Sequence, residues 1–242
     1  MYFDETDQRW LRHYAAARNP LGRAWLNAHY YCQRFVWHWE AHGDKAIKRA
    51  FDFSASLILL VLLSPLLLLI GLLVKLEDGG PIFFAQTRVG RFGREFKMYK
   101  IRSMCMNAEE KLKELLCQNQ HSEGVTFKIK DDPRITRIGR LLRKYSLDEL
   151  PQIYNVLIGD MSLVGPRPPL PREVKLYSLE DRRRLAALPG VTCIWQISGR
   201  SEISFSGQVK LDLDYIEHRS FWMDAKILAL TVPAVLSGKG AC

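Results

Sequence analysis

The strongest pattern along the chain is an apolar run from 53 to 74, FSASLILLVLLSPLLLLIGLLV, that contains no charged residue. A helix of this length matches the thickness of a lipid bilayer. Ser64 and Pro65 stand at its middle, where proline removes one helical hydrogen bond and clashes with the preceding turn. We therefore predict a membrane helix that is kinked or broken at Ser64-Pro65.

The flanks of this run leave its orientation open. Basic residues lie on both sides, at Lys48 and Arg49 before it and at Lys75 after it, so the positive-inside rule favours neither side. Two topologies are compatible with the pattern. One is a kinked helix that crosses the bilayer, and the other is a helix that dips in and returns to the same face. From these residues alone, the crossing helix is preferred because spanning helices tolerate proline.

Beyond the apolar run, the pattern predicts a small α+β domain in which helices dominate. Residues 82–104 favour a hairpin closed around Gly90 to Gly93. Helical spacing predicts helices over 107–119, 134–145 and 222–236, and the last two have faces that suit a membrane interface. The segment VTCIWQI, residues 191–197, predicts a strand.

Residues 1–44 differ from the rest in composition. Acidic residues occur early and no continuous apolar core follows, so the segment does not resemble a secretory signal. Tryptophan and tyrosine are interspersed with arginine there. This composition suits the headgroup level of a membrane, and it suits equally well a helix that packs on the rest of the protein or on a second copy.

Length, charge and cysteine content narrow the function classes. The 242 residues allow one sizeable core, and a formal net charge of +9 favours anionic partners such as phosphates, anionic lipid or nucleic acid. A nucleic-acid binder would leave the apolar run unexplained, so no nucleic-acid partner is expected. The five cysteines form no CxxC pair, which disfavours a disulfide framework or a zinc site. Metalloprotease, hydrolase-triad, EF-hand, Rossmann and Walker signatures are absent from the sequence.

The most informative polar segment is RKYSLDELPQ, residues 143–152. Its adjacent carboxylates, Asp148 and Glu149, follow a cluster of cations at a predicted helix start. This environment would keep them ionised and able to hold a metal or to attack phosphorus. Ser146 and Glu149 also fit a capping box, and with that interpretation the acids only cap a helix. These residues by themselves favour the capping interpretation.

Two further segments offer cations for a phosphate. In Gly165-Pro166-Arg167-Pro168-Pro169 the prolines would fix the backbone around one guanidinium, although a rigid surface turn has the same sequence. Arg88, with the arginines around Gly90 and Gly93, is the second candidate.

From about Lys48 onward the chain resembles the bacterial sugar transferases, the monotopic polyprenyl-phosphate hexose-1-phosphate transferases. The strings that carry the resemblance are KRAFDFSAS, Ser64-Pro65, QTRVGRFGREFKMYKIRSM, DDPRITRIGRLLRKYSLDELPQIYNVLIGDMSLVGPRPPLP, PGVTCIWQISGR and LDLDYIEHRS. This resemblance implies a lead segment over 1–44, a membrane helix over 45–78 and a catalytic domain with interface helices over 79–242.

The resemblance implies a role for each matching residue. Asp148 would be the nucleophile and Glu149 its partner, with Mg²⁺ bound at this pair. The residues that would bind substrate phosphates are Arg88, Lys100, Arg102, Arg143 and Arg167. Ser64-Pro65 would break a re-entrant helix, and Arg49 and Asp52 would position that helix in the membrane interface. Asp212, Asp214 and Tyr215 match a C-terminal pattern that we interpret as mostly structural.

The implied activity transfers a hexose 1-phosphate from a UDP-hexose, galactose or glucose, to undecaprenyl phosphate and releases UMP. It would be the first membrane step in the synthesis of exopolysaccharide, capsule or O-antigen, at the cytoplasmic face of the inner membrane. The lipid bilayer and a second copy of the chain are the other expected partners. The competing hypothesis is a membrane-anchored basic scaffold that binds lipid or phosphate without turnover.

Overall fold

The computed structural model describes residues 20–108, 110–111, 132–199 and 203–238. The chain divides into two compact units, Met1–Ala50 and Phe51–Cys242. The apolar run and the candidate carboxylates therefore belong to the same unit. The predicted helix over 107–119 lies mostly outside the described residues.

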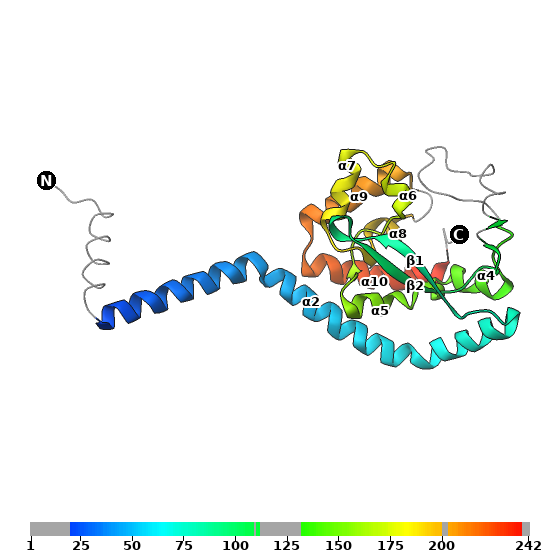
Figure 1. The fold of residues 1–242 in the computed structure, drawn as a ribbon, viewed down its shortest axis with the longest axis horizontal. Helices are drawn as coiled ribbons and strands as arrows, with labels where there is room; N and C mark the ends of the chain where they lie inside the picture. The colour runs from blue at the N-terminus through cyan, green and yellow to red at the C-terminus, as the bar shows by residue number, and fades with distance from the viewer. Residues whose placement is uncertain (1–19, 109, 112–131, 200–202, 239–242) are drawn as a thin grey trace. The chain divides into compact units, whose positions relative to one another are not determined.

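The apolar run forms part of one long helix, α2 (Pro20–Asp78), which continues through Ser64 and Pro65. Because Pro65 has no amide hydrogen, the carbonyl oxygen of Val61 loses its helical partner. The Ser64 hydroxyl donates to that oxygen at 2.8 Å. The helix is therefore continuous at Ser64-Pro65, and the prediction of a break there is wrong. The Ser64 side chain replaces the backbone hydrogen bond that Pro65 cannot make. Figure 1 shows the cyan part of α2 as two arms that meet at a bend.

Both arms of α2 pack on the rest of the second unit. Phe51, Ala55 and Leu59 of the first arm contact the main core cluster. Ile70 and Val74 of the second arm are buried in a smaller cluster with Ile101 and Leu142. The opposite side of the helix exposes Leu57, Ile58, Val61, Leu62, Leu68, Leu69, Leu72 and Leu73. The segment Lys45–Asp78 is long and apolar enough to cross a membrane, and an 18-residue window within it has a mean hydropathy of 3.1.

The predicted hairpin is confirmed as the antiparallel pair β1 (Phe83–Val89) and β2 (Glu95–Ile101). A 3₁₀ turn, η1 (Arg91–Gly93), closes it, with Phe92 at a φ of 56°. The Phe96 and Met98 side chains of β2 enter the main core cluster. Lys100, two residues further along, shares their face of the strand, since successive side chains alternate.

The strand predicted over 191–197 is confirmed only at Val191 and Thr192 and is wrong from Cys193 onward. β4 (Gly190–Thr192) pairs in parallel with β3 (Ser162–Val164), and the next residues form a short helix, α8 (Ile194–Ser198). The ladder ends because β3 is only three residues long. A helical turn capped at Gly199 then buries Trp195, so packing outweighs the strand preference of the apolar residues.

The remaining helices surround these strands. The predicted helices over 134–145 and 222–236 are confirmed as α4 (Arg137–Lys144) and α10 (Phe221–Ser237), and α4 begins where Thr136 accepts the amide of Gly139. The other helical elements are η3 (Leu147–Glu149), α5 (Gln152–Ile158), α6 (Pro171–Val174), α7 (Leu179–Arg182), η4 (Arg183–Ala186) and α9 (Phe205–His218). The domain is therefore helix-dominated, as the sequence predicts.

Candidate active site

The two adjacent carboxylates lie in the 3₁₀ turn η3, between α4 and α5. Ser146 turns the chain out of α4 with a φ of 52°, a left-handed conformation that is uncommon for serine. Its side chain makes no capping hydrogen bond, and α5 begins only at Gln152. The capping-box interpretation of Ser146 and Glu149 is therefore wrong. The turn serves to bring Asp148 and Glu149 against β2.

Glu149 is held by two cations at one oxygen. The Lys100 ammonium of β2 lies 2.7 Å from Oε1, and the Arg167 guanidinium lies 3.2 Å from the same atom. Burial alone would raise the pKa of Glu149, but Lys100 and Arg167 outweigh it, so the pKa lies well below its usual range. Glu149 is therefore ionised, and within the described part of the chain both of its ion pairs use Oε1, which leaves the second oxygen for another ligand.

Asp148 is 6% exposed and has no hydrogen-bond partner among the described residues. Burial and the neighbouring Glu149 raise its pKa, while the charges of Lys100, Arg143 and Arg167 oppose that rise. A desolvated carboxylate without hydrogen bonds is a better nucleophile than a solvated one. Nearby cations favour its ionised form.

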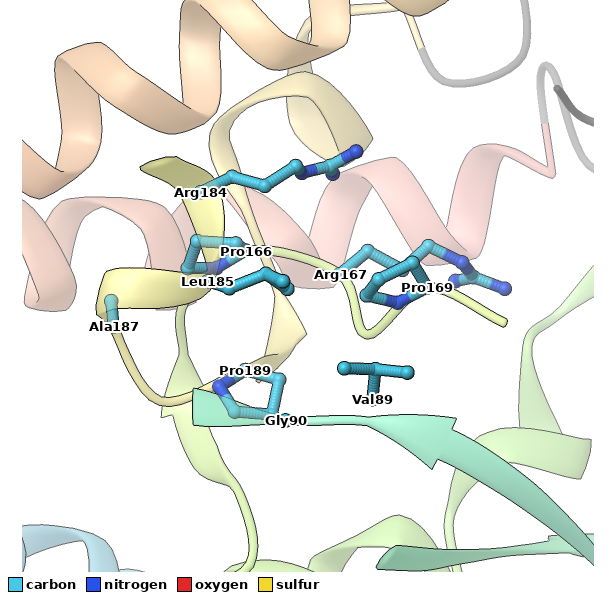
Figure 2. A pocket seen from close by; sticks show the side chains of 9 residues that line it. All are labelled: Val89, Gly90, Pro166, Arg167, Pro169, Arg184, Leu185, Ala187 and Pro189. Atoms are coloured by element: carbon cyan, nitrogen blue, oxygen red, sulfur yellow. The ribbon is translucent and has the colours of Figure 1, made fainter. Parts of the chain in front are cut away.

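Arg167 stands in the loop 165–169 directly after β3. The loop is fixed to both strand pairs, because Val89 donates its amide to the Pro169 carbonyl at 2.9 Å and Gly165 donates to that of Thr192 at 3.0 Å. Figure 2 shows a shallow hollow between the end of β1, this loop and residues 184–189, with Arg167 on its wall. Arg167 thus borders both the hollow and the carboxylate pair.

Arg88 and Arg143 support the site from either side. Arg88 donates to the Pro168 carbonyl at 2.9 Å and to the Gln86 side chain, so it holds the loop 165–169 against β1. Burial and the charge of Arg167 lower the pKa of Arg88 to about 10. Arg143, at the end of α4, donates to the Ser103 hydroxyl at 3.0 Å, and its charge acts on Asp148.

The structure places two other predicted site residues elsewhere. Arg102 is buried, forms an ion pair with the more exposed Asp78 and donates to the Pro81 carbonyl at 2.7 Å, so its described contacts tie the end of α2 to β2. Asp52 is also buried, and its carboxylate accepts the amide of Leu163 at 3.2 Å. Arg49 lies three residues before it on α2.

Sequence reasoning missed Asn155, which connects β2 to α5. Its side chain accepts the amide of Tyr99 at 3.1 Å and donates to the carbonyl of Lys97 at 2.7 Å. These bonds fix the strand that carries Lys100 next to the helix that follows Glu149. The sequence shows an asparagine among the apolar residues of QIYNVLI, but it does not show the partners of this residue, which lie 56 and 58 residues away.

The carboxylate pair fits Mg²⁺ in its chemistry. Magnesium is often held by one or two carboxylates together with substrate phosphates. Asp148 and the second oxygen of Glu149 supply such donors. Among the described residues no group of three or more His, Cys, Asp or Glu side chains gathers, so substrate oxygens or water would complete the coordination.

Sequence comparisons identify proteins to which this chain is similar. CpsE of Streptococcus agalactiae serotype III (strain NEM316), named a galactosyl transferase, is 50% identical over 195 residues, which are 80% of this chain and 43% of the relative. An undecaprenyl-phosphate galactose phosphotransferase of Salmonella typhimurium (strain LT2) is 45% identical over 82% of this chain and 42% of its own length. The exopolysaccharide production protein ExoY of Rhizobium meliloti (strain 1021) is 42% identical over 80% of this chain and 87% of its own length.

The chain thus spans less than half of the length of the first two relatives and most of the third. The sequence model described as "Bacterial sugar transferase" matches residues 43–238, which include the apolar run, both carboxylates and all of their cationic neighbours. With a match over most of its length and relatives at this level of identity, the chain belongs to the bacterial sugar transferase family.

Proposed function

We propose that this chain transfers a hexose 1-phosphate from a UDP-hexose to undecaprenyl phosphate and releases UMP. Galactose is the favoured sugar, because two of the relatives are named for galactose or galactosyl transfer, and glucose is the second choice. The product would begin the assembly of an exopolysaccharide, capsule or O-antigen on the lipid carrier. The name of ExoY supports the first of these pathways.

The observation that carries this proposal is the unequal pair of carboxylates. Glu149 is neutralised by Lys100 and Arg167, whereas Asp148 is buried beside it without a hydrogen bond to any of the described residues. In the first step Asp148 attacks the phosphorus next to the sugar and the bond to UMP breaks, which leaves a phosphosugar ester on Asp148. In the second step a phosphate oxygen of undecaprenyl phosphate attacks the same phosphorus, and the Asp148 carboxylate leaves.

The cations around the pair give this chemistry its electrostatic support. Negative charge collects on the phosphoryl oxygens in each transition state, and fixed positive groups stabilise it in a site with little water. Arg167 and Arg143 would contact those oxygens, while Lys100 would hold the Glu149 carboxylate through its ion pair. Mg²⁺ held by Asp148 and Glu149 would supply Lewis-acid polarisation of the phosphoryl group.

We propose that the protein is monotopic, on the cytoplasmic face of the inner membrane. Both arms of α2 pack on the same domain, and the opposite side of the helix exposes apolar side chains on each side of the bend, where Ser64 is the one exposed polar residue between Leu57 and Leu73. A bent helix that enters one leaflet accounts for this better than a straight span. Amphipathic α4 and the exposed Phe221 and Trp222 of α10 would lie at the headgroups.

A labelling experiment tests this topology. Single cysteines near residues 5 and 180, in a background without the native cysteines, should both resist an impermeant thiol reagent in intact cells. Labelling near residue 5 alone would establish a crossing helix and leave the chemistry at Asp148 untouched.

The function itself is tested by product analysis. Purified protein in lipid nanodiscs, with Mg²⁺ and a panel of UDP-sugars, should release UMP and incorporate label from donor labelled in the sugar. Asp148→Asn should abolish both, whereas Asp214→Asn, a change at a carboxylate 54% exposed, should not. UDP as the product, or labelled Asp148→Asn, would refute the covalent mechanism. A scaffold without turnover would release no UMP from any donor.

A further inference from the structure

The strand that precedes Arg167 is held by three buried polar side chains from three helices. Leu163 of β3 donates its amide to Asp52 of α2 at 3.2 Å. The hydroxyl of Tyr215, on α9, lies 3.1 Å from the Val164 carbonyl oxygen and 2.8 Å from a carboxylate oxygen of Asp224, on α10. We call Asp52, Tyr215 and Asp224 the β3 clamp.

The clamp is unusual in its burial. Asp52, Tyr215 and Asp224 are 2%, 3% and 7% exposed. Burying carboxylates is costly, and apolar residues of similar size often stabilise a core more. Burial raises the pKa of the Tyr215 phenol, which therefore stays protonated and can donate. A role in fixing the position of β3 for function would explain why the β3 clamp is kept at this cost in stability.

Only two residues, Gly165 and Pro166, separate β3 from Arg167. Their backbone conformations have little freedom to compensate for a displacement of the strand. Pro166 has a fixed φ angle and accepts the amide of Gly190 at 2.9 Å. Gly165 and Gly190 are in such close backbone contact that a Cβ on either would overlap the other chain. A displacement of Val164 would therefore reach Arg167, whose contact with Glu149, at 3.2 Å, is already at the upper end of hydrogen-bond distances.

We propose that Tyr215 is a positioning residue, which acts through β3 to set Arg167 for the phosphates of the donor. The proposal rests on the proposed function, in which Arg167 binds those phosphates. Asp52 fixes the same strand from α2, so the clamp also joins the apolar helix to the site. Tyr215 itself does not contact the substrate.

A double-mutant cycle tests this role. Tyr215→Phe removes only the hydroxyl, and we expect it to raise KM for the UDP-sugar about tenfold with a smaller change in kcat, equivalent to about 1.4 kcal/mol, the size of one hydrogen bond. Arg167→Lys should raise the same KM. If Tyr215 acts through Arg167, the double variant should be no worse than Arg167→Lys alone.

Thr231→Val is the matched control. It removes the 2.8 Å bond between the hydroxyls of Thr231 on α10 and Thr192 on β4, the neighbouring strand that does not lead into Arg167. It should lower the thermal midpoint without a change in KM. Asp224→Asn keeps an acceptor for Tyr215 and should also retain a normal KM.

The proposal would be overturned if the rise in KM of the double variant equalled the product of the rises caused by Tyr215→Phe and Arg167→Lys alone. It would also be overturned if Thr231→Val raised KM as much as Tyr215→Phe does. If Tyr215→Phe does not fold, Asp52→Leu takes its place in the same cycle. If neither folds, the clamp serves stability alone and the positioning role is rejected. Release of UMP by the unaltered protein is measured in the same assays, so failure of the proposed function would be recognised separately.

Discussion

The bend in α2 predicts an energetic coupling between Ser64 and Pro65. Pro65 leaves the Val61 carbonyl without an amide donor, and the Ser64 hydroxyl replaces it at 2.8 Å. Ser64→Ala should therefore orphan that carbonyl. In Pro65→Ala the amide of residue 65 returns, so the serine becomes dispensable. The two positions should depend on each other although their side chains need not touch.

The size of the coupling follows from the bond that is lost. An unpaired backbone carbonyl costs about 1–3 kcal/mol when it is buried away from water, and the cost is higher in lipid. Val61 is 66% exposed on the protein surface, so in a membrane its surroundings would be lipid. We expect Ser64→Ala to lower the free energy of unfolding by about 1–2 kcal/mol with Pro65 present, and by under about 0.5 kcal/mol in the Pro65→Ala background.

Denaturant unfolding in bicelles, followed by tryptophan fluorescence, measures both free energies. Ser56→Ala is the control, since Ser56 makes the same type of bond, to the Phe53 carbonyl at 3.0 Å, where position 57 is a leucine with its amide intact. The control should therefore cost the same with and without Pro65. Equal costs for Ser64→Ala in both backgrounds would refute the explanation of the bend.

Three other predictions concern the site. Arg167→Lys keeps the charge but loses the forked donors, so kcat/KM for the UDP-sugar should fall about tenfold or more; near-normal kinetics would make the loop a structural turn. Because the pKa of Asp148 is raised by burial, its labelling by donor should decline, as pH falls, at a higher pH than for an ordinary aspartate. Lys100 lowers that pKa, so Lys100→Met should move the decline to still higher pH, and a shift to lower pH in stopped-flow labelling would contradict the assignment. Gly190→Ala places a Cβ against the backbone of Gly165, and its thermal midpoint should fall by several degrees, whereas an unchanged midpoint would show that the strands can separate freely.

Features set by local sequence were predictable. Alternation and the glycines around the turn predicted the hairpin of β1 and β2, and helical spacing predicted α4 and α10. The strand predicted through Trp195 failed, because the short partner β3 decides where pairing ends. Residue patterns report a local preference, but they do not report how long a distant partner strand is.

The residue types of the site could be predicted from the sequence, but many of the contacts between those residues could not. The acids and cations were identified, yet the capping pattern at Ser146 concealed a left-handed turn. Arg102 resembled its neighbour Lys100 in the sequence, but its partner Asp78 is 24 residues away, at the end of α2. Pairings over such separations depend on the tertiary fold, so a single sequence could not assign one cation to the carboxylates and the other to the helix.

The packing of both arms of α2 against one domain has a consequence for kinetics. In the proposed monotopic topology, a domain fixed to one leaflet at two places would meet its lipid-linked acceptor by lateral diffusion, while the sugar nucleotide would arrive from the aqueous phase. The acceptor concentration that governs turnover is then a mole fraction in the bilayer, so dilution with inert lipid should slow the second step. Dilution of the whole suspension with buffer, at constant donor concentration, should leave that step unchanged for each enzyme molecule.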